Sequence, residues 1–126
     1  MNILKYFLVI VLVFNFNSKL FAKDPSALIN EIVDDAAAVL SSEDPVEAKI
    51  IKLNEIAERS VDIQGIGMYT LGKYRKNISS DDKAKYQKLF RSYFLKSFSS
   101  RLVDYTNPKI NVVSQKKIND KYTIVN

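Results

Sequence analysis

The fold of this chain depends most on residues 61–105, which read VDIQGIGMYTLGKYRKNISSDDKAKYQKLFRSYFLKSFSSRLVDY. The spacing of apolar residues predicts two helices here. The first is expected over 62–71, with Asp62 as its N-cap and Gly72 just past its end, where glycine commonly stops a helix. A longer helix is expected over 80–104.

The long helix carries the strongest pattern. Ser79 precedes it as an N-cap, and Asp82 three residues later completes a variant of the capping box. At 100° per residue, an arc of roughly 220° is apolar, comprising Leu89, Phe90, Tyr93, Phe94, Phe98, Leu102 and Tyr105. The opposite side holds Lys85, Lys88, Ser92, Lys96 and Ser99. So broad an arc predicts a helix that packs on a sheet or lines an apolar cavity, and a plain core helix is the alternative.

The composition excludes several classes of function. The chain has 126 residues, enough for one domain, and contains no cysteine, histidine or tryptophan. Disulfides and thiol nucleophiles are therefore excluded, and the commonest general base and transition-metal ligand is missing. No spacing indicates a carboxylate pair or a Ser/Lys site. The acidic residues of 24–47 are explained as helix caps and solvated faces, so we expect no metal, no cofactor and no enzymatic activity.

The charge is divided unevenly along the chain. Residues 23–62 hold four lysines and arginines against ten aspartates and glutamates, whereas residues 63–126 hold thirteen against four. The basic half is suited to anionic lipid head groups, to nucleic acid or simply to water. Because its charges are spaced along a helix rather than gathered in an arm, we expect no nucleic-acid partner.

Residues 1–22 are typical of a secretory signal peptide. Lys5 supplies a short positive region, and Tyr6 to Phe14 is an unbroken apolar run of nine residues. That run is far shorter than the roughly twenty residues needed to span a bilayer. With cleavage after Ala22, the mature domain is expected to begin at Lys23 and to lie in the periplasm.

Two shorter helices are predicted before the long one, over 25–40 and about 45–59. Each opens at an Asp-Pro pair, which places the aspartate at the N-cap and the proline at the first helical position. Glu47 is expected to complete a cap of the second helix. Both helices carry a narrow apolar stripe and an acidic outer face.

After Tyr105 the apolar period changes from 3.6 to 2. Residues 109–117 and 121–126 are predicted as two strands joined by a turn at Asn119 and Asp120. A lone hairpin is marginally stable in water, so the pattern predicts half of a sheet.

Three pieces of the sequence together resemble one family. They are Val61-Asp62-Ile63, then Leu71-Gly72-Lys73-Tyr74-Arg75-Lys76, then the aromatic helix over 86–105. This order and spacing is similar to the MlaC, or toluene-tolerance, family of periplasmic phospholipid-binding proteins. The resemblance implies an α+β fold in which helices cover one face of a twisted antiparallel sheet. Family members continue with further strands and a closing helix, so we expect this chain to be C-terminally truncated after the first hairpin.

The resemblance also implies a function and partners. It implies a carrier of phospholipid that shuttles between an inner-membrane ABC transporter complex, with its ring of substrate-binding domains, and an outer-membrane lipoprotein–porin complex. Such a carrier maintains the lipid asymmetry of the outer membrane. The alternative from the residues alone is a secreted adaptor, without enzymatic activity, that docks on an acidic partner through its basic face.

The carrier hypothesis makes a set of residues candidates for lipid contact. The apolar slot is expected to be lined by Ile63, Ile66, Leu71, Leu89, Tyr93, Phe94, Phe98, Leu102, Val112 and Ile124. Ordinary core packing is the alternative for each of them. Tyr93 and Tyr105 are expected to place their hydroxyl groups at the mouth of the slot. Arg75 and Lys76 are candidates for contact with the head group or a partner, with a solvated loop as the alternative.

Overall fold

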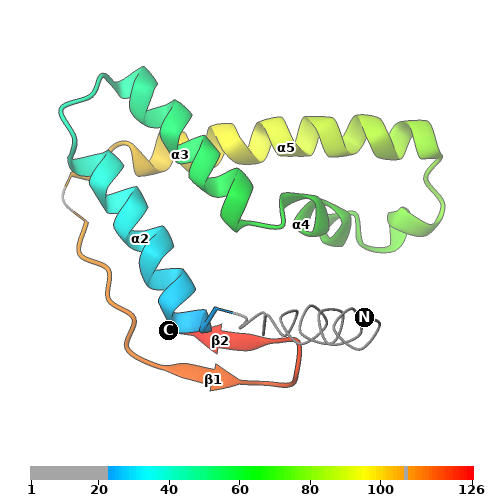
Figure 1. Ribbon diagram of the computed structural model, residues 1–126. Coiled ribbons are helices and arrows are strands. Elements are labelled where there is room, and N and C mark those ends of the chain that lie inside the picture. The colour runs from blue at the N-terminus through cyan, green and yellow to red at the C-terminus, as the bar shows by residue number, and fades with distance from the viewer. Residues whose placement is uncertain (1–22, 107) are drawn as a thin grey trace, which may run out of the picture.

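The computed structural model describes residues 23–106 and 108–126, and the predicted signal peptide over 1–22 lies outside them. The described elements are, in order, α2 (Pro25–Ser41), α3 (Val46–Ser60), α4 (Ile63–Thr70), the 3-10 helix η1 (Gly72–Lys76), α5 (Ser80–Leu102), β1 (Gln115–Lys117) and β2 (Thr123–Val125) (Figure 1). The fold is mostly helical with a small antiparallel sheet, which confirms the predicted α+β class. No helix within the described ranges has the length and apolar character needed to cross a bilayer.

Side-chain caps start three of the helices where the sequence predicts them. The carboxylate of Asp62 accepts a hydrogen bond from the Gly65 amide at 2.8 Å, and the Ser79 hydroxyl accepts one from the Asp82 amide at 3.1 Å. Asp24 caps α2 in the same way. The start of α3 differs from the prediction, because Pro45 occupies the N-cap position and no side chain caps the helix.

Helices α3 and α4 both pack against α5, while α2 packs against α3 (Figure 1). The buried core where they meet contains Ala57 of α3, Ile63 of α4 and Leu95 of α5. Val61, Phe90, Phe94 and Phe98 are partly buried around it. The aromatic side of α5 therefore packs mainly against other helices.

The buried face of α5 is rotated from the predicted one. Ser99, expected on the solvated side, is 1% exposed, and its hydroxyl donates to the Leu95 carbonyl at 2.8 Å. Leu89 and Tyr93, expected inside, are 62% and 70% exposed. The physical reason is that α5 meets α3 and α4 at Leu95, which lies in the buried core with Ala57 and Ile63, so the buried face follows that contact.

The sheet is a short hairpin. Strands β1 and β2 are antiparallel, with Gln115 opposite Val125, and both are shorter than predicted. The amide of Asn126 still donates to the Ser114 carbonyl at 2.9 Å, which extends the pairing by one residue. The turn lies where predicted, since the Asn119 side chain accepts from the amides of the two residues that begin the return, Lys121 and Tyr122. The hairpin's main contact with the helices is through β2 and α2.

Candidate functional site

A largely apolar groove of about 560 Å³ lies between α2, the last turns of α5 and the extended segment 108–110. Its described lining residues are Ile32, Val33, Ala36, Ala37, Leu40, Phe98, Leu102, Tyr105, Pro108, Lys109 and Ile110. Lys109 supplies the one charged side chain among them. The volume falls within the roughly 300–1,000 Å³ typical of ligand sites.

Helix α2 forms one wall because its apolar residues recur at helical spacing. Ile32, Ala36 and Leu40 are four residues apart and therefore share a face of the helix. Ala36 and Ala37 sit in the middle of that wall, and both line the groove. Their short side chains fill little of the space between α2 and α5, which leaves the hollow open.

Helix α5 supplies the opposite wall through the end of an aromatic ladder. Tyr86, Phe90, Phe94 and Phe98 follow one another at four-residue intervals, with ring centroids 5.9, 6.3 and 5.9 Å apart. The rings of Phe94 and Phe98 are nearly parallel, at 9°. Phe98 packs on the core and also borders the groove. Its ring therefore contacts the core on one side and faces the groove on the other.

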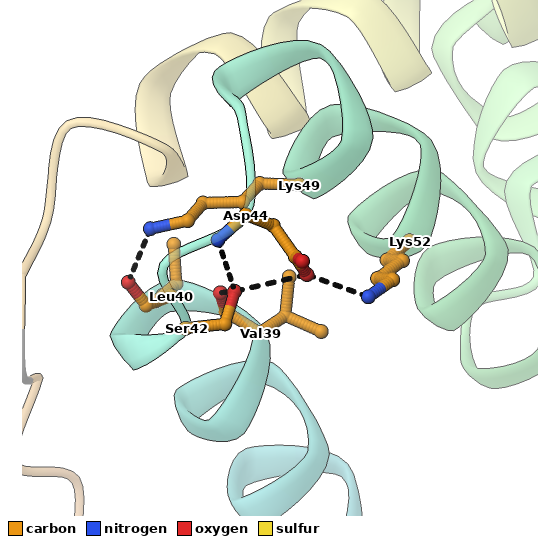
Figure 2. Close-up of polar contacts among 6 residues, drawn as sticks. All are labelled: Val39, Leu40, Ser42, Asp44, Lys49 and Lys52. Carbon is orange, nitrogen blue, oxygen red and sulfur yellow. Dashed lines mark hydrogen bonds and ion pairs between the residues drawn. The ribbon is translucent and has the colours of Figure 1, made fainter.

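Polar contacts link α2 and α3 at the loop that joins them. Figure 2 shows the Asp44 carboxylate accepting hydrogen bonds from the Lys52 ammonium at 2.6 Å and the Ser42 hydroxyl at 3.1 Å. The Lys49 ammonium donates to the carbonyl of Leu40, a groove residue, at 3.0 Å. The hydrogen bond from Lys52 lowers the pKa of Asp44, and the hydrogen bond from Ser42 lowers it further.

A second tie joins the same two helices, where the Arg59 guanidinium pairs with the Asp35 carboxylate. These exposed contacts add modestly to the direct packing of α2 on α3. The two ion pairs, Asp44 with Lys52 and Asp35 with Arg59, do not border the groove.

A family model described as "MlaC protein" matches residues 17–126, which is most of the chain. The chain belongs to the MlaC family. Members of this family are periplasmic proteins of phospholipid transport, and they carry lipid rather than catalyse a reaction. Neither the search of curated proteins nor the search of solved structures found a match.

In this MlaC protein, some of the residues predicted for lipid contact border the apolar groove. Phe98 and Leu102 do, and Tyr105, expected at the mouth, does as well. Ile63 is buried in the helical core, and Phe94 is half-buried against it. As lipid contacts all these residues remain predictions.

The remaining predicted slot residues do not border the groove. Leu71 and Val112 are half-buried. Exposed side chains, all at least 40% accessible, are those of Ile66, Leu89, Tyr93 and Ile124.

The two predicted head-group residues also lie far from this groove. Arg75 and Lys76 belong to η1, which precedes α5, whereas the groove borders the last turns of α5 (Figure 1). From Ser80 to Phe98 the helix rises about 27 Å. The charged side chain that does border the groove is that of Lys109.

Sequence reasoning missed the contribution of α2. None of the predicted slot residues lies in α2, although the adjacent small side chains of Ala36 and Ala37 in its apolar stripe are a signal for a hollow beside the helix. No local pattern in residues 108–110 indicates that they line a groove, because that role depends on their position across from α2. Within 23–106 and 108–126, no group of acidic side chains is arranged to hold a metal ion.

Proposed function

We propose that this protein is the soluble periplasmic carrier of an ABC-type lipid transport system that moves phospholipid between the outer and inner membranes and maintains outer-membrane lipid asymmetry. The observation that carries the proposal is the apolar groove of about 560 Å³ in a chain of the MlaC family. We propose that an acyl chain of the lipid lies against Phe98 and Leu102 on one side and against the alanines of α2 on the other.

The physical need for such a groove follows from the solubility of lipid. A phospholipid has about thirty methylene groups, and each costs about 0.8 kcal/mol to expose to water. The total of about 25 kcal/mol prevents free lipid from crossing an aqueous compartment at a useful rate. Shielding the tails requires apolar surface and no reactive residue, which fits a chain without histidine or cysteine.

The proposed partners follow from the same function. A carrier must load and unload at each membrane, so we propose docking to an inner-membrane ABC transporter complex with its ring of substrate-binding domains and to an outer-membrane lipoprotein–porin complex. Because the lysines and arginines are concentrated after residue 62, complementary acidic surfaces on these partners are expected.

Two alanines of α2 provide a matched test. Ala37 borders the groove, whereas Ala38 next to it is exposed and does not. Ala37→Trp should fill the hollow, and the protein purified from the bacterial periplasm should carry much less phospholipid by mass spectrometry than Ala38→Trp. Both proteins should retain the same helical circular dichroism.

Equal lipid content in the two variants would contradict the groove as the lipid site. Absence of lipid from the unmodified protein would contradict the carrier function and favour the adaptor alternative. An adaptor would instead bind an acidic partner in a salt-sensitive way, unaffected by Ala37→Trp.

A further inference from the structure

The turn and 3-10 helix between α4 and α5 form a basic, aromatic corner. Within residues 69–76, Tyr69 is 79% exposed and Tyr74 is 66% exposed. The same segment contains three cations, Lys73, Arg75 and Lys76, and no carboxylate. In the described part of the chain none of these cations forms an ion pair, and Lys73 instead lies 5.4 Å from the centre of the Tyr74 ring.

The backbone presents this segment outward. Gly72 adopts a φ of +54°, a left-handed conformation that ends α4 and redirects the chain into η1. In a 3-10 helix, residues three apart eclipse each other, so Lys73 and Lys76 lie on one side. In Figure 1 the segment lies at an outer corner of the molecule, near the start of α5 and away from α2.

Acidic residues close by do not cancel the positive charge. Asp81 and Asp82 begin α5, where carboxylates complement the positive end of the helix dipole. The Asp82 carboxylate also accepts a hydrogen bond from the Ser79 hydroxyl at 2.7 Å. Over residues 73–88 there are six lysines and arginines against these two carboxylates, so the corner is positive overall.

We propose that residues 69–76 dock this protein on the surface of an anionic phospholipid bilayer. The cations would meet lipid phosphates, and the rings of Tyr69 and Tyr74 would lie at the level of the head groups, where tyrosine is enriched in membrane proteins. The corner stands a helix length from the apolar groove, so the anionic groups it meets belong to lipids outside the groove. Docking therefore does not depend on groove occupancy or on the proposed carrier function.

Each lysine or arginine near an anionic surface strengthens binding about fivefold. Replacing Lys73, Arg75 and Lys76 together with glutamine should therefore weaken vesicle binding on the order of a hundredfold. The interaction should also weaken as salt is added, because exposed charges are screened.

The test is a flotation assay of the full chain with vesicles of phosphatidylglycerol and phosphatidylethanolamine, compared with vesicles of phosphatidylcholine alone. The control variant replaces Lys96, Arg101 and Lys121, three exposed cations outside the corner, with glutamine. It removes the same charge and should bind nearly as well as the unmodified protein. Tyr69→Ser with Tyr74→Ser should weaken binding while leaving all charges in place. The groove variant Ala37→Trp should still bind.

Several results would overturn the proposal. They are equal binding to anionic and neutral vesicles, equal loss of binding in the 73/75/76 variant and its control, or no binding of the unmodified protein to either vesicle. If only the groove variant lost binding, contact would run through the groove and the docking proposal would be wrong. Salt-sensitive binding to an acidic protein with none to vesicles would assign the corner to a protein partner.

Discussion

A Cβ atom placed on Gly67 would lie 2.8 Å from Cδ1 of Phe90, closer than two carbon atoms can approach. Where α4 crosses α5, the space beside the Cα atom of Gly67 therefore holds only a hydrogen atom. The neighbouring Thr70 and Tyr86 hydroxyls, 2.7 Å apart, hold the same two helices together one turn further on.

Gly67→Ala should therefore destabilise the protein by about 1 kcal/mol, because the steric cost exceeds the gain in helix propensity. Urea unfolding followed by circular dichroism would measure the change. Adding Phe90→Leu should recover part of the loss, since the smaller side chain no longer meets the new methyl group. A double variant whose loss equals the sum of the single losses would contradict this account.

Gly72 offers a test of backbone conformation without a steric contact. No atom lies within 4 Å of where its Cβ would be, yet its φ is +54°. Gly72→Ala should cost about 1 kcal/mol of unfolding free energy, whereas Gly72→Asn should cost less because asparagine tolerates the left-handed region. Equal losses for the two variants would show that backbone strain is not the cause.

Ser99 is a buried polar residue of α5, and its hydroxyl donates to the Leu95 carbonyl of the same helix. Ser99→Ala should change the unfolding free energy by less than about 1 kcal/mol, because the hydroxyl bonds only within its own helix. Ser99→Leu should cost about 1–3 kcal/mol, because the site is filled. Thermal unfolding of both variants beside Ser100→Leu, an exposed control, would separate packing from helix propensity.

The contacts of Asp44 between α2 and α3 should make a pH-dependent contribution to the free energy of unfolding. The folded-state pKa of Asp44 is lowered below its ordinary value of 3.8, so its stabilisation is present above about pH 4 and is lost as pH falls through the lower folded value. Asp44→Asn should therefore be less stable than the unmodified protein at neutral pH. The two stabilities should converge in strong acid, as measured by urea unfolding at a series of pH values. A difference that stays constant across that series would contradict the role of the carboxylate.

The local signals in the sequence were reliable where chemistry acts over a few residues. The caps at Asp62 and Ser79 and the turn at Asn119 are confirmed, because each depends on a side chain and an amide two or three residues away. The stop at Gly72 is also confirmed, because it depends on the left-handed backbone of that one residue. The family assignment is likewise confirmed by the match over residues 17–126.

Long-range packing was harder to predict. The apolar arc of α5 is wider than the face its neighbours cover, so the sequence alone did not say that Ser99 would be inside and Tyr93 outside. The groove depends on Ala37 and Ile110, which are far apart in sequence and meet only through the fold. No periodicity within one helix can indicate such a pairing.

The hairpin's limited attachment has a consequence for local stability. Because β2 touches the helices mainly through α2, while α5 is packed by both α3 and α4, the two parts should open with different free energies. In deuterium exchange the amide of Asn126 should therefore lose protection well before that of Leu95. We expect the hairpin to detach from α2 while the packed core of α3, α4 and α5 stays folded.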